Sequence, residues 1–243
     1  MAVEQPKALI RDVRARHEAV RERIARAAER AGRHPAEIAI VAVTKGFGPE
    51  AVVAAAAAGI RAVGENRVQE AREKKPLALA LLAAAPAFEL PAWRLIGHLQ
   101  SNKAGLAAEL FDWIDAVDSL ALATLLSRRA VAAGRTLRVL VEVKLAPEDT
   151  KYGAAPEEAV DLVPAIAALP GLEVGGLMTV APLDAPARPA FQALAALRGR
   201  LAATTGAPLP HLSMGMSGDF EVAIEEGATF VRVGSALFEG VES

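Results

Sequence analysis

The chain contains no cysteine among its 243 residues. This absence excludes disulfide bonds, zinc sites built on cysteine and thiol nucleophiles, and it gives no clue to the redox compartment. The sequence also lacks an uninterrupted apolar run of roughly 18 residues, the length that a membrane-spanning helix needs. Its N-terminus is charged rather than apolar, unlike a signal peptide. We therefore predict a cytoplasmic protein with no membrane partner.

An excess of one charge sign is missing as well. The formal net charge is −2, so the overall electrostatics give no reason to expect a nucleic-acid partner. Hydrophobic residues, in contrast, make up 53% of the chain, which is enough for one sizeable core. We expect residues 1–243 to form a single domain, and we expect no metal site.

Short apolar or β-branched runs alternate with helical segments along most of the chain. An amphipathic helix is predicted over Pro6–Gly32. The predicted strands after it cover Ile38–Val43, Arg61–Val63, Trp93–Ile96, Trp113–Val117, Leu137–Val143, Leu172–Met178, His211–Leu212 and Phe230–Val233. The predicted helices between them include Pro49–Ala58, Asn66–Lys75, Ser119–Ala133, Pro156–Ala168, Ala187–Ala203 and Asp219–Glu226.

About eight such βα units favour an α/β fold, namely a single (β/α)8 TIM-type barrel with an extra N-terminal helix. A doubly wound open sheet is the alternative, and it is disfavoured because no G-x-G-x-x-G follows the first strand. The segment Pro76–Pro91 is rich in proline, alanine and leucine, which predicts an irregular insertion or a helix–loop excursion. Polar residues gather directly after the predicted strands, and in a parallel barrel these positions share the C-terminal face, where active sites lie.

Lys45 follows the first predicted strand and precedes Gly46. A lysine at the end of a buried strand is costly unless it reaches a pocket, where desolvation lowers its pKa and leaves a nucleophilic amine. Such an amine can form a Schiff base with an aldehyde. The alternative is an ordinary surface lysine, and position alone does not decide between them.

Two later segments predict an anion site. They are LSMGMSGD (Leu212–Asp219) and VRVGSALF (Val231–Phe238), and each places glycine and serine between a strand and a helix. Backbone N–H groups at such turns bind anions, and barrel phosphate sites use the loops after the last two strands. Ordinary helix capping is the alternative for either turn alone. Arg232 lies inside the final strand, where burial requires a carboxylate, a phosphate or a ring nitrogen as partner.

Four further residues are open to two interpretations. Asn66 could cap the next helix or direct its amide at a ligand. His98 could carry a proton near neutral pH or make structural hydrogen bonds. Glu142 and Lys144 alternate with valines, so one of these polar side chains could face the barrel interior.

Taken together, these segments resemble the pyridoxal phosphate homeostasis protein family, relatives of the N-terminal barrel of alanine racemases. The matching strings are AVTK, GENRVQE, WRLIGHLQSNK, DTKYG, GLMTVAP and LSMGMSGDFEVAIEEGATFVRVGSALF. The resemblance implies that pyridoxal 5'-phosphate (PLP) is held as a Schiff base on Lys45. It implies that the phosphate is held by Ser217, Gly234 and Ser235, that Met214, Gly215 and Met216 shape the loop, and that Asn66 and Arg232 lie near the cofactor.

Two features depart from the family pattern. Lys144 stands where a neutral polar residue is more frequent, and Pro76–Pro91 is longer than usual. The resemblance implies a PLP-binding protein of PLP and amino-acid homeostasis that is not an enzyme, and that could release PLP to apo-enzymes. Racemisation needs a second acid or base, which related racemases take from an additional C-terminal domain. This chain ends at Ser243, and its single tyrosine, Tyr152, is a poor substitute.

Two other functions stay open. One is a weak PLP-dependent amino-acid racemase or lyase, with His98 or Lys45 as the base. The other is a phosphosugar-processing barrel that uses a Schiff-base lysine without PLP, which fits the lysine and the anion loops equally well. Because the racemases dimerise partly through the additional domain, we expect a monomer.

Overall fold

The computed structural model describes residues 4–85, 87–145, 152–182, 184–206 and 208–240. Its strands form a closed parallel barrel in the order β1 to β8. The strands span β1 Ala39–Val43, β2 Ala62–Glu65, β3 Ala92–Leu95, β4 Trp113–Val117, β5 Leu137–Glu142, β6 Leu172–Met178, β7 His211–Met216 and β8 Phe230–Val233. The predicted (β/α)8 barrel is therefore confirmed.

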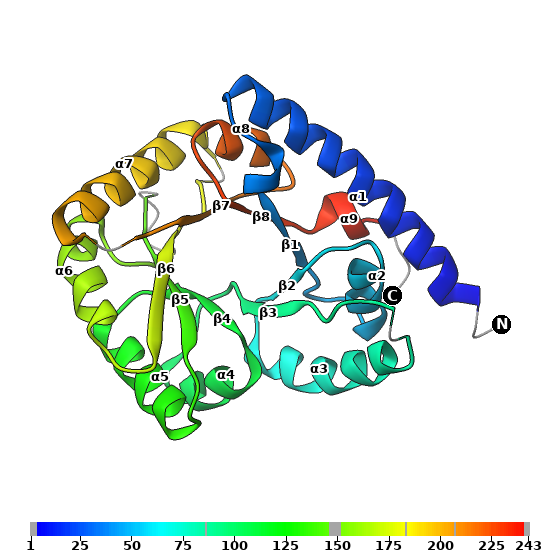
Figure 1. Ribbon diagram of the computed structural model, residues 1–243, viewed down its shortest axis with the longest axis horizontal. Helices are drawn as coiled ribbons and strands as arrows, with labels where there is room; N and C mark the ends of the chain where they lie inside the picture. Colours follow the sequence, from blue (N-terminus) through cyan, green and yellow to red (C-terminus); the bar gives the residue numbers. More distant parts are fainter. Residues whose placement is uncertain (1–3, 86, 146–151, 183, 207, 241–243) are drawn as a thin grey trace.

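Helices surround the barrel, as Figure 1 shows in a view along its axis. They span α1 Glu4–Arg30, α2 Pro49–Ala57, α3 Val68–Ala83, α4 Ala104–Leu110, α5 Leu120–Ala132, α6 Pro156–Ala167, α7 Arg188–Thr205, α8 Phe220–Glu225 and α9 Ser235–Phe238. Single 3-10 turns occur at η1 Pro35–Glu37 and η2 Ser101–Lys103. The predicted N-terminal helix is present as α1, which lies outside the ring against α2 and α8. The prediction gave no bounds for the short helices α4 and α9.

Closure of the barrel joins the two ends of the sequence. Strand β1 pairs in parallel with β8, and Ala39 is opposite Phe230 while Ala42 is opposite Val233. The loop that carries Lys45 after β1 therefore leaves the barrel beside the turn that begins at Gly234. No helix in the described part of the chain combines the length and the apolar character that crossing a bilayer requires.

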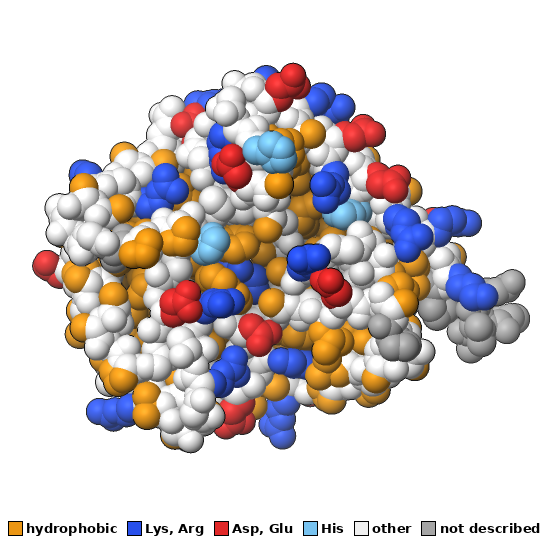
Figure 2. Space-filling view, viewed as in Figure 1, with side chains coloured by type: hydrophobic (Ala, Val, Ile, Leu, Met, Phe, Trp, Pro, Cys, Tyr) orange, Lys and Arg blue, Asp and Glu red, His pale blue; other side chains and the backbone are white. Residues whose placement is uncertain are grey.

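Helix α3 decides between the two interpretations of Pro76–Pro91, because the segment begins as helix and is therefore a helix–loop excursion. Pro76 lies inside the helix, which continues to Ala83. Proline in a helix interior costs about 3 kcal/mol or more, but Ala78 and Leu82 are buried by the continued helix. Burial against the rest of the molecule is what stabilises most helices in proteins, and here it offsets the proline. Figure 2 shows hydrophobic side chains on the surface over α3, where Leu77 and Leu81 are exposed.

The interior of the barrel is unusually polar. Trp113, Leu140 and Met178 form a small apolar cluster, separate from the large core that includes the apolar residues of the surrounding helices. Charged side chains share this interior with them. They are Arg94, Asp115, Glu142 and Arg232, whereas Glu65 at the end of β2 is buried against Lys74 of α3. Burying a charge is costly unless it is paired and hydrogen-bonded, so the partners of these residues matter for both stability and function.

Candidate functional site

Lys45 lies in the loop that follows β1, at the C-terminal mouth of the barrel. Its side chain is exposed. The expectation that burial desolvates its amine is therefore not met in this structure. Among the described residues, Lys45 has no hydrogen-bond or ion-pair partner, so its amine is free to meet a ligand at the mouth.

The Lys45 loop packs against the turn after β8. A Cβ atom added to Gly234 would lie 3.3 Å from the Cβ of Val43, the last residue of β1. The rings of Phe47 and Phe238 also meet, with centroids 5.3 Å apart. The lysine and the predicted anion turn are thus neighbours, although they lie almost 190 residues apart in the sequence. This is what a closed barrel predicts for loops at opposite ends of the chain.

The turn after β7 meets the turn after β8 through Ser217. The Ser217 hydroxyl oxygen accepts hydrogen bonds from the N–H groups of Gly234, at 3.2 Å, and Ala236, at 3.3 Å. Asp219 closes its own turn by accepting the N–H of Met216 at 2.5 Å. Two backbone donors therefore converge on one oxygen beside the Lys45 loop. The same donors suit the oxygens of a phosphate.

Two residues of this segment support the turn from below. Gly215 has φ +91°, and a Cβ there would lie 2.6 Å from the Cβ of Ala223 and 2.9 Å from the Cα of Phe220. Glycine is therefore required for the close packing of β7 against α8. Met214 is fully buried in the large core. Its side chain does not reach the mouth, so any contact of Met214 with a cofactor would have to come from its backbone.

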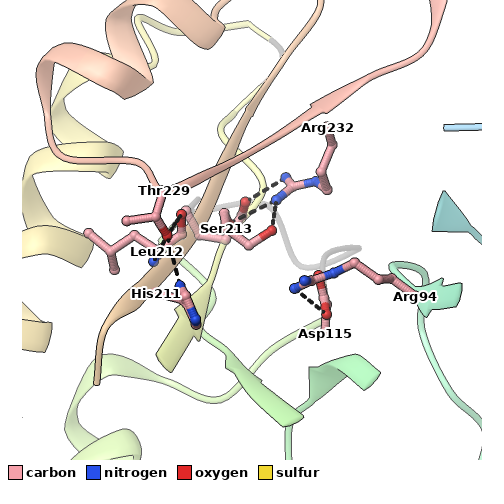
Figure 3. Close-up of polar contacts among 8 residues, drawn as sticks. Arg94, Asp115, His211, Leu212, Ser213, Thr229 and Arg232 are labelled. Atoms are coloured by element: carbon pink, nitrogen blue, oxygen red, sulfur yellow. Dashed lines mark hydrogen bonds and ion pairs between the residues drawn. The ribbon is translucent and has the colours of Figure 1, made fainter. Parts of the chain in front are cut away.

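Arg232 is buried inside the barrel, as its place in the final strand indicated. Its guanidinium donates to the backbone oxygen and the hydroxyl of Ser213, at 2.8 and 3.0 Å, and to the backbone oxygen of Thr179 at 2.8 Å. Figure 3 shows the side chain of Arg232 pointing toward Ser213. Burial lowers the pKa of Arg232, while the carboxylates of Asp115 and Glu142 act in the opposite direction. The partners within hydrogen-bonding distance are therefore neutral oxygens, and the carboxylates act from further away.

Asn66 follows β2 at the same mouth, and it does not cap α3. The residue at the N-cap is Arg67, which makes no side-chain cap hydrogen bond. Asn66 is half-buried, and its backbone packs against Gly97, where a Cβ would lie 2.5 Å from the Asn66 backbone oxygen. The interpretation of Asn66 as a helix cap is therefore wrong, and its amide is left for another role.

His98 and Tyr152 come together at the mouth, although they follow different strands. Their rings stack with centroids 3.6 Å apart and planes 10° apart. His98 Nδ1 also lies 3.7 Å from a carboxylate oxygen of Asp118. Lys144 is half-buried, and its backbone N–H donates to the backbone oxygen of Ala154. Part of the DTKYG string, Asp149 to Lys151, lies outside the described residues.

Sequence reasoning missed the polar cluster beneath the Lys45 loop. The Lys74 ammonium, on α3, is buried against the carboxylates of Glu65, at 2.6 Å, and Glu70, at 2.9 Å. Glu70 also accepts the N–H of Gly46 at 2.6 Å. The spacing of Glu70 and Lys74, four residues apart in a helix, was the available signal. It is a weak signal, because such pairs usually lie on exposed helix faces.

Glu142 is a further buried carboxyl, which the sequence left as one of two candidates for the barrel interior. It faces the barrel interior, and one of its carboxylate oxygens has no hydrogen-bond partner among the described residues. Burial raises the pKa of Glu142 to about 7, and Arg232 opposes that rise only in part. Of the two polar residues on this stretch, Glu142 is therefore the one that lies within the barrel.

The raised pKa of Glu142 predicts a pH-dependent contribution to the stability of the protein, and Glu142→Gln removes that contribution. The folded protein binds more protons than the unfolded chain between pH 4.5 and about 7. The contribution of Glu142 to stability therefore falls as the pH rises through that window. We expect the stability of Glu142→Gln relative to the wild type to increase by roughly 2 to 3 kcal/mol between about pH 5 and about pH 8.

Urea unfolding of both proteins at the two pH values measures this difference. The control is Glu173→Gln, which changes an exposed carboxylate on β6. A stability difference between Glu142→Gln and the wild type that is the same at both pH values would show that Glu142 does not titrate in this range.

Comparison with known proteins defines the class of this barrel. The family model of the alanine racemase N-terminal domain matches residues 16–241. The chain therefore belongs to the alanine racemase N-terminal domain family, within which its curated relatives are the pyridoxal phosphate homeostasis proteins. One such protein, from Pseudomonas aeruginosa, is 43% identical over 216 residues, which cover 89% of this chain and 90% of the relative.

Solved structures show the same architecture. A crystal structure of a protein from Bifidobacterium adolescentis is 39% identical and has a TM-score of 0.88, with 95% of this chain and 96% of that chain covered. PipY from Synechococcus elongatus, solved with PLP bound, is 35% identical and has a TM-score of 0.78. That comparison covers 93% of this chain and 99% of PipY.

Proposed function

We propose that this protein binds PLP at Lys45 and keeps it available inside the cell without catalysing a reaction of its own. The observation that carries the proposal is the contact between the Lys45 loop, after β1, and the turn at Gly234, after β8, which is hydrogen-bonded to Ser217. An exposed amine and converging N–H donors fit the aldehyde and the phosphate of one small molecule. The PLP in the PipY structure and the name of the curated relatives support the same function.

Each residue at the mouth has a distinct part in this proposal. PLP supplies an aldehyde that condenses with a lysine amine to a Schiff base with loss of water, and Lys45 provides the amine. Ser217, Gly234 and Ser235 bind the phosphate through hydroxyl and backbone donors. Arg232 and Asn66 orient the ring, and Met214 supports the loop from the core. The Arg232 guanidinium is held by Thr179 and Ser213, so its direction is fixed before a ligand arrives.

A cation near the ring also argues for storage rather than catalysis. PLP enzymes use the ring as an electron sink, which works best when the ring nitrogen is protonated. If Arg232 meets that nitrogen, its positive charge disfavours protonation and weakens the sink. The curated relatives carry the name of a homeostasis protein, not of an enzyme.

We further propose that residues 1–243 form a single PLP-binding domain. We propose that the protein is a cytoplasmic monomer and that apo-enzymes receive its PLP.

Proton exchange on an amino acid separates storage from weak racemase activity. The loaded protein is incubated with L-alanine in deuterated water, and the α-proton is followed by NMR. We expect exchange no faster than with the same concentration of free PLP, because no acid–base pair is proposed to act on the substrate. Faster exchange that disappears in Lys45→Ala would identify an enzyme instead. An authentic alanine racemase serves as the positive control.

A further inference from the structure

The residues on both sides of Lys45 are held by hydrogen bonds to α3. The backbone oxygen of Thr44 accepts a hydrogen bond from the Lys74 ammonium at 2.7 Å. The N–H of Gly46 donates to the Glu70 carboxylate at 2.6 Å. The backbone is thus fixed immediately before and after Lys45, while the Lys45 side chain itself is exposed.

The turn between these two bonds has a defined shape. The N–H of Phe47 donates to the backbone oxygen of Thr44 at 3.1 Å, which closes the turn around Lys45 and Gly46. Gly46 has φ +77°, a conformation that favours glycine. Because the turn is closed internally and tied to α3 at two points, it has little freedom to rotate Lys45 away from the mouth.

The Lys74 ammonium has a full set of partners. Its nitrogen lies within hydrogen-bonding distance of Thr44 O, of Glu65 Oε1 at 2.6 Å and of Glu70 Oε1 at 2.9 Å. An ammonium has three protons, so these three oxygens account for all of them. The Thr44 hydroxyl also donates to Glu65 Oε1, at 2.6 Å.

Because the cluster is buried, its charged groups must keep their partners. Only 5% of the Lys74 side chain and none of the Glu65 side chain is exposed. A buried charge that loses a partner is left uncompensated, which is strongly unfavourable. The cluster therefore holds its own geometry tightly, and the geometry that it holds includes the backbone of Lys45. An ammonium at the surface would not need three protein partners, because water could replace them.

We infer that Lys74, Glu65 and Glu70 form a positioning unit that holds the Lys45 turn so that its amine faces the bound aldehyde. This inference rests on the proposed function of Lys45. The positioning unit touches the backbone that carries the amine, not the cofactor. Its effect is to reduce the number of orientations that the amine must search before the bond forms.

Glu70 gives the cleanest test because it is the outermost member of the unit. Glu70→Ala removes the acceptor of the Gly46 N–H, whereas Glu70→Gln keeps an amide oxygen in its place. We expect Glu70→Ala to slow covalent attachment of PLP to Lys45 by roughly tenfold, since one hydrogen bond to a charged group is lost. We expect Glu70→Gln to recover most of that rate.

A second readout needs no cofactor. Amide hydrogen exchange of Gly46 is measured in the PLP-free protein by mass spectrometry or NMR. We expect exchange to become roughly tenfold faster in Glu70→Ala and to stay near the wild-type rate in Glu70→Gln. A general loss of stability would instead accelerate exchange throughout the barrel.

Lys74→Met, with Lys75→Met as its control, tests the centre of the unit. Lys75 lies on the same helix, is half-buried, and donates to the backbone oxygen of Leu110, away from the Lys45 turn. We expect Lys75→Met to lose some stability but to attach PLP at the wild-type rate. Lys74→Met should attach PLP more slowly under conditions in which both variants are folded, and the Glu70 variants decide the matter if Lys74→Met does not fold.

The outcomes are distinguishable. If Gly46 exchanges faster in Glu70→Ala while attachment keeps its wild-type rate, the cluster only stabilises the barrel rim and the inference is wrong. Equal slowing in Glu70→Ala and Glu70→Gln would also contradict it, because the acceptor would then be irrelevant. If the wild-type protein forms no bond at Lys45 at all, the proposed function itself fails, whatever the exchange of Gly46 shows.

Discussion

Lys45→Ala is expected to abolish covalent attachment of PLP. Lys45 provides the amine in the proposed function, and its exposed side chain lies beside the Gly234 turn. With alanine in its place, the phosphate donors at Ser217 and Gly234 remain, so residual non-covalent binding is expected. Borohydride reduction of protein incubated with PLP, followed by mass spectrometry, measures the covalent fraction. We expect that fraction to fall from near stoichiometric in the wild type to background in the variant.

Lys144→Ala is the matched control. Lys144 also follows a barrel strand at the C-terminal mouth, but its backbone is bound to Ala154 on the opposite part of the ring. We expect its removal to leave the covalent fraction unchanged. Undiminished labelling in Lys45→Ala would show that another lysine carries the cofactor. Loss of labelling in Lys144→Ala would then identify Lys144 as that lysine.

Among the substitutions proposed for this protein, Asp115→Ala is expected to cause the largest loss of stability. Figure 3 shows Arg94 and Asp115 facing each other inside the barrel, and two guanidinium nitrogens of Arg94 lie 2.9 to 3.1 Å from the carboxylate. The guanidinium also lies 4.2 Å from the Trp113 ring centroid and 4.0 Å from that of Phe230. Removing Asp115 leaves this buried charge unpaired, which costs about 3 to 5 kcal/mol of unfolding free energy.

Two further variants separate pairing from packing. Glu173→Ala removes one partner of an exposed pair with Arg138, and we expect a change of at most about 1 kcal/mol. The double variant Arg94→Met with Asp115→Leu removes both buried charges, and we expect it to regain most of the stability lost in Asp115→Ala. Urea unfolding of the four proteins measures these differences. An Asp115→Ala variant as stable as Glu173→Ala would contradict this account of the barrel interior.

The order of the strands and the proximity of the Lys45 and Gly234 loops could be predicted from sequence because their signals are local. Short apolar runs bounded by polar residues gave Trp113–Val117, Leu172–Met178 and Phe230–Val233 with the bounds that the structure has. The barrel then brings the loop of Lys45 next to Gly234, since the first and last strands of a closed barrel must pair. Both steps follow from periodicity and topology alone.

The buried charges could not be predicted because each one depends on a partner from another element of the fold. Arg94 and Asp115 lie on neighbouring strands, but the sequence does not say which faces of those strands point inward. Lys74 is buried only because Glu65 and the Thr44 backbone are nearby in space. The continuation of α3 past Pro76 depended in the same way on tertiary packing, which outweighed the local preference of proline.

The most direct test of the proposed function is the visible spectrum of the purified protein with PLP, before and after borohydride reduction, together with peptide mapping of the reduced sample. The account predicts an absorption band of a Schiff base that reduction removes, and a pyridoxyl label on the peptide containing Lys45. A colourless protein that takes up no added PLP would contradict it and would favour a barrel that acts on phosphorylated sugars through the same lysine.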